Sequence, residues 1–269
     1  MSDTQLSSSR AYRPPQSSSF SGSRATRVSY GIALCKRGSD GIIRILMINK
    51  RYTYAFFAFV MHRFNMHDDD AIVALFDQMT IDEKLDILSM NFAQMWYRIW
   101  LNRCTAGMYG EANNYFHTHF MVDNCARLRK LIRRSHNNSA ERVWEIPKGR
   151  RKGASEYGVD CAIREFYEET GIPRSAYHLT QGTHEIEFTE DGIQYHVTYY
   201  IAVTMRDVRQ RIDVTSLDQV NEVCNMRWVA SSELGAFAPR DIPGYRLIIR
   251  YAKRILNNMF KCIGAHSSS

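Results

Sequence analysis

The chain has 269 residues, of which 45% are hydrophobic, so it can form one large domain or two small ones around a buried core. No apolar run approaches the ~20 residues of a membrane span, and the N-terminal stretch lacks the apolar segment of a secretory signal. Six scattered cysteines without a CxxC pair argue against a disulfide scaffold or a zinc cluster and favour a cytoplasmic protein without membrane contact.

Positive charge is concentrated in one segment of the chain. The formal net charge is +7, and residues 122–152 hold ten Lys or Arg against three Asp or Glu. The rest of the sequence is therefore close to neutral. A local positive field suits a polyanionic partner, although such runs are also common on solvated protein surfaces.

The N-terminal part of the chain divides into a tail and a hairpin. Residues 1–27 are rich in serine with few apolar side chains, so we expect a disordered tail. Apolar residues then alternate from Val28 to Leu34, and a turn signal at residues 38–41 precedes a second apolar run. Residues 28–51 are therefore predicted to form a β-hairpin that opens a folded domain.

Residues 52–136 carry helical signals in place of strand signals. Thr80 and Glu83 form a capping-box pattern, which starts a helix by satisfying its first free amides. Apolar residues then recur at three- and four-residue steps from Leu85 to Ile99, which predicts one amphipathic helix. We expect this segment to be an all-helical unit whose aromatic residues form its own core.

The end of this helical unit is basic. Residues 124–138 predict a helix with a positively charged exposed side, ending at asparagine-rich turn residues. His117 and His119 form an HxH pair ahead of it, but no other ligands nearby complete a zinc site. We interpret both histidines as polar loop residues.

Strand signals resume in residues 137–265. A short strand near Trp144 is followed by a glycine-containing loop and a helix that stops at Gly171. A second hairpin is predicted to turn at Asp191-Gly192, and a short strand and an amphipathic C-terminal helix follow. The whole pattern predicts an α/β domain that is interrupted by an all-helical insertion.

One helix of this domain carries a cluster of carboxylates. Glu165, Glu168 and Glu169 lie at positions i, i+3 and i+4, so they share one helix face. Carboxylates at such spacing repel one another, and divalent cations such as Mg²⁺ or Mn²⁺ relieve the repulsion. Arg164 precedes them and is placed to pair with Glu156. Taken alone, the same pattern also fits a solvated acidic face with an ordinary salt bridge.

The spacing from Glu156 through "REFYEETGI" resembles the Nudix box, whose pattern is Gly, five residues, Glu, seven residues, Arg-Glu-apolar-x-Glu-Glu-x-Gly-apolar. In this chain six residues separate Gly149 from Glu156, which puts the geometry of the loop in question. The resemblance implies an α/β/α sandwich, metal ligation by the three helix carboxylates, and support of the loop by Arg164 with Glu156.

A more specific resemblance covers about residues 29–260. The segments "KRYTYAF", "MTIDEKL", "MWYRIW", "WEIPKG" and "CAIREFYEETGI" are similar to viral Nudix mRNA-decapping enzymes, namely those of African swine fever virus and, more distantly, poxviruses. The resemblance implies hydrolysis of the mRNA cap in the host cytoplasm, with release of 7-methyl-GDP and 5′-monophosphate RNA. By the same match, Glu222 is a further metal ligand or general base.

Several residues are candidates for contacts with capped RNA. Lys148 and Gly149 lie at the mouth of the expected metal site, where a lysine suits cap phosphates. Tyr54, Tyr195 and Tyr199 are candidates for stacking on the cationic cap base, although tyrosines on strands more often belong to the core. The basic helix supplies the candidate RNA-binding residues Arg127, Arg129, Lys130, Arg133 and Arg134.

Two other functions fit parts of the sequence. The basic loop also suits a hydrolase of diphosphoinositol polyphosphates or dinucleoside polyphosphates. A catalytically inactive RNA- or cap-binding module is the third possibility, and the intact acidic helix argues against it. The helical insertion favours decapping, because an enzyme for small ligands has no need of some eighty additional residues. The sequence carries no signal for an oligomeric state.

Overall fold

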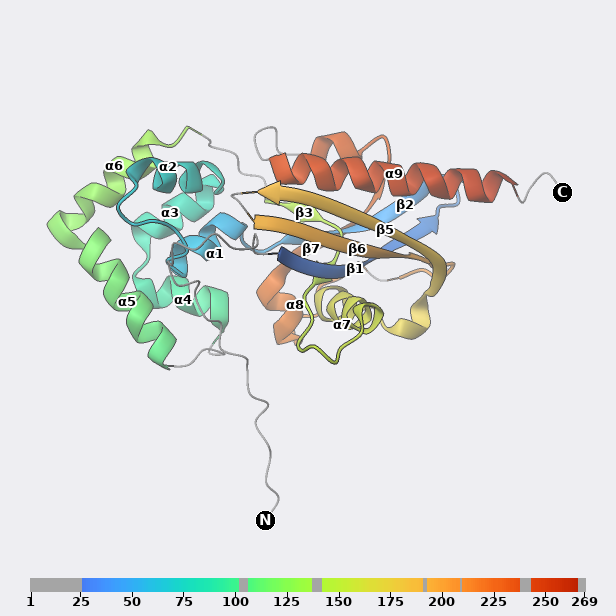
Figure 1. Ribbon diagram of the computed structural model, residues 1–269, viewed down its shortest axis with the longest axis horizontal. Helices are drawn as coiled ribbons and strands as arrows, with labels where there is room; N and C mark the ends of the chain where they lie inside the picture. The colour runs from blue at the N-terminus through green and yellow to red at the C-terminus, as the bar shows by residue number, and fades with distance from the viewer. Residues whose placement is uncertain are drawn as a thin grey trace, which may run out of the picture.

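The computed structural model describes residues 26–101, 106–136, 142–190, 193–208, 210–237 and 243–265. An all-helical unit lies beside a mixed sheet that is covered by helices on both faces (Figure 1). The expected tail and the expected turn at Asp191-Gly192 lie outside these residues, except that Thr26 and Arg27 already belong to the first strand. In the described part of the chain, no helix has the length and apolar character to cross a membrane.

The sheet has the order β3-β2-β1-β6-β5, with β4 paired to β1 and β7 paired to β2. The predicted first hairpin is confirmed as an antiparallel β1–β2 pair, and β6 runs parallel to β1. The strand predicted near Trp144 is confirmed only for Trp144 and Glu145, which pair with β2, whereas Lys148 and Gly149 of the predicted loop pair with β1. The strands are β1 (Thr26–Arg37), β2 (Ile43–Lys50), β3 (Trp144–Glu145), β4 (Lys148–Gly149), β5 (His178–Glu190), β6 (Ile193–Val203) and β7 (Val223–Ala230).

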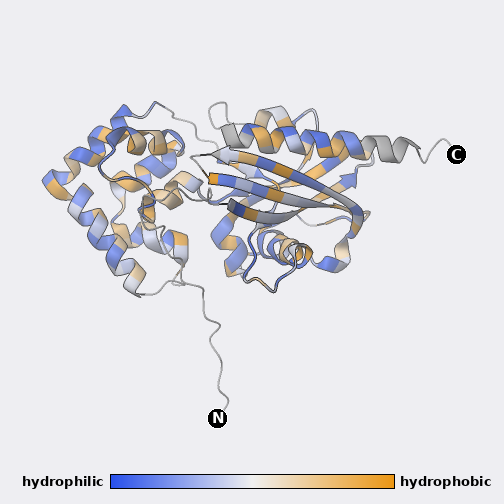
Figure 2. Ribbon diagram, viewed as in Figure 1, coloured by the Kyte–Doolittle hydropathy of each residue, from blue (hydrophilic) through white to orange (hydrophobic). Residues whose placement is uncertain are grey.

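The two faces of the sheet are buried in two separate cores. Alternate residues of β1 point in opposite directions, so Ala33 and Cys35 pack towards α9 (Pro243–Ala265), whereas Ile32 and Leu34 pack towards α7 (Gly158–Thr170). Hydrophobic and hydrophilic residues accordingly alternate along the strands and along the covering helices (Figure 2). This arrangement confirms the predicted α/β/α class.

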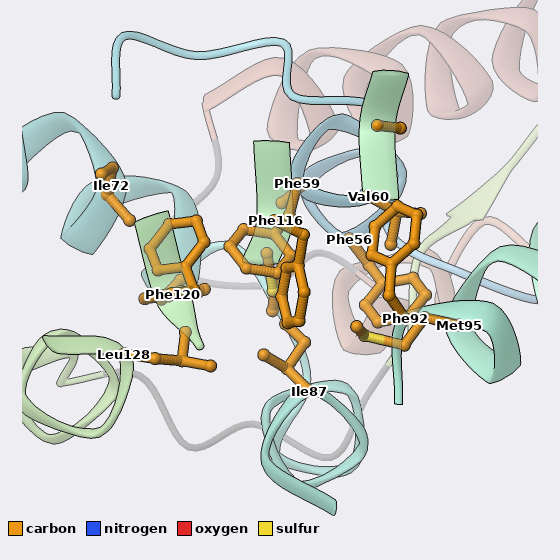
Figure 3. Packing of buried hydrophobic residues seen from close by; sticks show 14 of the residues in the cluster. Phe56, Phe59, Val60, Ile72, Ile87, Phe92, Met95, Phe116, Phe120 and Leu128 are labelled. Carbon is orange, nitrogen blue, oxygen red and sulfur yellow. The ribbon is translucent and has the colours of Figure 1, made fainter. Parts of the chain in front are cut away.

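Residues 54–134 form helices within the described chain, with a core separate from the two cores of the sheet. Phe59 lies at its centre, with its ring centroid 5.3 Å from those of Phe76 and Phe120 and 6.2 Å from that of Phe116 (Figure 3). The helices are α1 (Tyr54–Val60), α2 (Asp69–Asp77), α3 (Ile81–Ser89), α4 (Phe92–Trp100), α5 (Ala106–Phe120) and α6 (Ala126–Arg134), with η1 (Val122–Cys125) before α6.

The prediction of a single helix after Thr80 is wrong in one respect. The capping box at Thr80 and Glu83 is present, but the helix ends at Met90, whose backbone is extended. Asn91 and Gln94 form a second capping box that starts α4. The apolar stripe is therefore divided, and its first members Leu85 and Leu88 are exposed; the local capping bonds outweigh the continuous helical periodicity.

The interpretation of His117 and His119 as loop residues is also wrong, because both lie in the last turn of α5. Hydrophobic spacing in that segment is weak, which is why the sequence did not indicate this helix. The remaining short elements are η2 (Arg174–Ala176), α8 (Leu217–Glu222) and η3 (Leu234–Phe237).

Candidate active site

The acidic helix α7 is fixed against the sheet by its apolar side. Cys161, Ala162 and Phe166 are buried, and Gly171 ends the helix with φ of 68°, a left-handed conformation that glycine adopts without strain. β4 passes so close that a Cβ on Gly149 would lie 2.0 Å from the Glu165 carboxyl carbon. A larger residue there would displace the Glu165 carboxylate, so β4 and α7 keep this close contact even though the loop before Glu156 has one more residue than the Nudix pattern.

Arg164 ties the loop to the helix. Its Nε donates to Glu156 Oε1 at 2.7 Å, and its Nη2 donates to the carbonyl of Arg150 at 2.9 Å. The same guanidinium donates to Glu165 at 2.7 Å and to Glu168 at 3.0 Å. The hydrogen bond from Arg164 is the main reason that the pKa of Glu156 falls to about 2.

Lys50, at the end of β2, lies among three carboxylates. Its Nζ is 2.5 Å from Glu169, 3.2 Å from Glu222 and 3.7 Å from Glu145. Burial raises the pKa of Glu169 to about 8, although Lys50 opposes the rise. The second oxygen of Glu169 accepts the backbone N–H of Lys148 at 2.9 Å. The end of α7 is thus connected to both β2 and β4.

Glu145 is completely buried and joins the helical unit to this site. Tyr54, the first residue of α1, donates its hydroxyl to the Glu145 carboxylate at 3.1 Å. Lys148 Nζ donates to the same carboxylate at 2.8 Å and lies 5.7 Å from the centre of the Tyr54 ring. Burial alone raises the pKa of Glu145, but Lys148 and Lys50 outweigh it, so the net shift is downward.

Comparison with known protein families identifies this arrangement. Residues 126–251 match the model of the NUDIX domain. The chain contains a Nudix hydrolase domain. The match covers the acidic helix and its loop but omits β1 and β2, which the helical unit separates from the rest of the Nudix domain in the sequence.

Curated relatives are viral proteins. The chain is 29% identical over 209 residues to the mRNA-decapping protein g5R of African swine fever virus (isolate Pig/Kenya/KEN-50/1950), covering 75% of this chain and 84% of that protein. It is 26% identical over 242 residues to a putative mRNA-decapping protein of Acanthamoeba polyphaga mimivirus, covering 80% of this chain and 66% of that protein.

The solved structures that match are more distant. The Ap4A hydrolase of C. elegans in a binary complex has 13% identity and a TM-score of 0.41, covering 86% of this chain and 98% of that chain. A Nudix hydrolase from M. smegmatis, RenU, has 13% identity and a TM-score of 0.41, with 87% of each chain covered.

Nudix hydrolases generally use divalent metal ions, and the donor types here suit them. Glu165, Glu168, Glu169 and Glu222 offer only carboxylate oxygens, the ligands that Mg²⁺ and Mn²⁺ favour. Burial, with the nearby charges of Glu168 and Glu222, raises the pKa of Glu165, so the site gains from added positive charge.

The carboxylates are oriented towards the protein's own cations. Arg164 bonds Glu165 and Glu168, Lys152 donates to Glu168 at 2.9 Å, and Lys50 bonds the other two. In the described residues, no three His, Cys, Asp or Glu side chains are gathered as ligands around one point. Metal binding therefore requires these carboxylates to turn away from lysine and arginine.

The three candidate tyrosines differ in their surroundings. The side chain of Tyr199 is completely buried in the core beneath α9, so the expectation that its ring stacks on a cap base is wrong for this conformation. Tyr195 is partly buried, stacks on Phe188 at 4.9 Å between ring centroids, and accepts a hydrogen bond from Arg27. Of the three, only Tyr54 is exposed, with 52% of the residue accessible, while its hydroxyl is bound to Glu145.

The basic helix α6 presents less free charge than its sequence indicates. Arg127 donates to Asp69 at 2.7 Å, and Arg134 donates to Asp70. Arg133 bonds the carbonyl of Arg129 through its Nε, which leaves its remaining donors exposed. Arg129, Lys130, Arg133 and Arg134 are exposed, and among the described residues only Arg134 of these four has an ion-pair partner, Asp70.

Sequence reasoning missed two residues of the Nudix site, Lys50 and Glu145. Both lie inside the quoted segments "KRYTYAF" and "WEIPKG", so the only available signal was their place in a motif. No spacing rule connects them, because Lys50 and Glu169 are 119 residues apart in the sequence.

Proposed function

We propose that this protein hydrolyses the 5′ cap of mRNA and releases 7-methyl-GDP and 5′-monophosphate RNA, which promotes mRNA turnover. One observation carries the proposal. The similarity to relatives named mRNA-decapping proteins extends over 209 residues, more than residues 126–251 contain, so it includes sequence outside the Nudix match. The substrate is thus capped RNA, and the cytoplasm, where mRNA is translated, is the expected location.

The proposed reaction adds water across a phosphoanhydride bond of the cap triphosphate. Glu165, Glu168, Glu169 and Glu222 would hold Mg²⁺ or Mn²⁺, which when bound polarises the phosphoryl oxygen and lowers the pKa of a water molecule. Arg164 keeps the carboxylate helix and the loop in register through its bonds to Glu156 and the Arg150 carbonyl.

Contacts with the cap are assigned to the side of the site next to the helical unit. Lys148, whose side chain is 14% exposed and donates to Glu145, is assigned to the cap phosphates, and Gly149 lets the backbone approach Glu165 closely. The exposed ring of Tyr54 lies beside Lys148 and suits stacking on a cationic base. The exposed charges of α6 would contribute to binding the RNA body.

Product analysis tests the proposal directly. Purified protein is incubated with RNA labelled in its cap, with Mg²⁺ or Mn²⁺, and the products are separated by thin-layer chromatography. We expect labelled 7-methyl-GDP in the presence of either metal and none in EDTA. Diphosphoinositol polyphosphates and dinucleoside polyphosphates are assayed in parallel. Turnover of either small substrate without release of 7-methyl-GDP would replace decapping by the alternative hydrolase activity.

A further inference from the structure

A cleft of about 480 Å³ lies at the boundary between the helical unit and the Nudix domain. Its walls come from α3 and α4 on one side, and from the β2–α1 connection, α8 and the start of β7 on the other. α4 and α8 lie next to each other across this boundary (Figure 1). We call it the arginine cleft, after Arg51, Arg98 and Arg142 in its lining.

Tyr52 lines the cleft together with these three arginines. Tyr52 donates its hydroxyl to the carbonyl of Arg98 at 3.0 Å, and the charges of Arg51, Arg98 and Arg142 all lower its pKa, although burial produces a net rise. Three guanidinium groups within range of one side chain create a strongly positive wall. Such a wall is stable next to carboxylates or when it binds an anion.

The carboxylates of the cleft neutralise only part of this charge. Asp86 pairs with Arg98. Glu83 is turned away, because it accepts hydrogen bonds from Thr53 at 2.7 and 2.8 Å and from the Thr80 backbone at 2.9 Å. Asp82, the third acidic residue of the lining, is exposed in the first turn of α3.

Arg51 and Arg142 form no ion pair within the described residues. Arg142 makes a long contact of 3.8 Å to the sulfur of Cys224, and Arg51 Nε is buried without a hydrogen-bond partner. A buried donor without a partner destabilises the fold, and an anion that accepts from it removes that cost. Arg51 also forms a side-chain hydrogen bond with Tyr52, so its guanidinium keeps a neutral partner and, among the described residues, no carboxylate. Two guanidinium groups on one wall without a carboxylate partner in the described part of the chain are the chemistry expected of a site for phosphate groups.

The arginine cleft is continuous with the catalytic carboxylates. Arg51 follows Lys50 directly, and its backbone N–H donates to the carbonyl of Glu222 at 2.9 Å. On the side of the helical unit, Tyr97 and Leu85 offer exposed apolar surface. In an RNA whose cap triphosphate lies at the carboxylates, the next phosphate groups can therefore contact the guanidinium groups, and a base can contact the aromatic ring of Tyr97.

We propose that the arginine cleft binds the first phosphodiester groups of single-stranded RNA on the 3′ side of the cap triphosphate. This inference rests on the proposed decapping function, which supplies the RNA substrate. The volume of the cleft falls within the ~300–1,000 Å³ range of small-ligand pockets, so it accommodates one or two nucleotides and excludes a duplex. The contacts are to phosphate, so the site has no sequence preference.

The test measures RNA binding without catalysis. The variant Arg51→Gln/Arg142→Gln is compared with wild type by fluorescence anisotropy, using a 3′-labelled ten-nucleotide RNA with a 5′ monophosphate in EDTA, over a series of KCl concentrations. We expect the Kd to rise about tenfold and the slope of log K against log salt to fall by ~1.4, which corresponds to two phosphate contacts.

A matched control separates a local contact from a general loss of charge. Arg37→Gln/Arg206→Gln removes the same charge at the far end of β1, where Thr204 N donates to the Cys35 carbonyl at 3.0 Å. Its Kd should change less than twofold. Equal effects of the two double variants, or no effect of Arg51→Gln/Arg142→Gln, would overturn the proposal.

Two further measurements keep the test decisive. Arg51→Lys/Arg142→Lys retains the charge and should recover most of the affinity; an affinity as low as that of the glutamine variant would contradict a phosphate site. If the glutamine variant fails to fold, Tyr97→Ala takes its place and must weaken binding at least threefold. The decapping assay on wild type is independent, because absence of 7-methyl-GDP refutes the proposed function whatever the RNA affinity.

Discussion

Glu145→Gln is the most informative single substitution in the site, because it removes a buried charge and keeps the shape of the side chain. Glu145 is fully buried and holds Lys148 at 2.8 Å, the Tyr54 hydroxyl at 3.1 Å and Lys50 at 3.7 Å. Removing one member of a buried ion pair typically costs ~3–5 kcal/mol. The amide oxygen can still accept from Tyr54, so we expect a loss of about 3 kcal/mol in unfolding free energy at pH 7.

The pH dependence of this loss has a defined sign. The net pKa of Glu145 is lowered in the folded protein, so its ionised form contributes stability above the unfolded-state pKa. That contribution disappears as the pH falls through the folded-state pKa. The difference between wild type and Glu145→Gln should therefore be constant above about pH 5 and shrink below about pH 4.5.

Urea unfolding monitored by circular dichroism in EDTA measures this difference. Glu187→Gln serves as a matched control, because Glu187 is 60% exposed and its partner is His196 at 3.1 Å. The control should stay within about 0.5 kcal/mol of wild type. A loss below 1 kcal/mol for Glu145→Gln at pH 7, or an undiminished difference at pH 4, would refute the reasoning.

Three further predictions concern metal and RNA. Burial raises the pKa of Glu169 to about 8, and a metal needs the ionised carboxylate. The Mn²⁺ affinity measured by calorimetry should therefore rise up to tenfold per pH unit from pH 6 to 8 and then level off. An Mn²⁺ affinity that does not change with pH would contradict this. Glu168→Gln should lower cap hydrolysis by more than about a hundredfold with RNA affinity retained, and full activity would exclude Glu168 as a ligand. Arg129→Glu/Lys130→Glu should weaken RNA binding and reduce its salt slope by ~0.7 per lost phosphate contact, whereas unchanged affinity would place the RNA path away from α6.

The sequence by itself determined those features that depend on neighbouring positions. Glu165, Glu168 and Glu169 share a face because a helix repeats every 3.6 residues, and Gly171 ends that helix because its left-handed backbone suits glycine. The first hairpin and the capping box at Thr80 follow from equally short-range patterns. The acidic helix and the α/β class could therefore be predicted from the order of the residues alone.

Only the tertiary structure decided how charges from distant segments meet. Lys50 lies within 4 Å of Glu145, Glu169 and Glu222 because β2 ends beside both α7 and α8, and no spacing in the sequence encodes that proximity. Folding likewise turned Arg127 towards Asp69, which removed charge from a helix that looks uniformly basic in the sequence. Backbone periodicity depends on residues that are close in the sequence. The pairing of a buried charge with one of opposite sign depends on which segments the fold brings together.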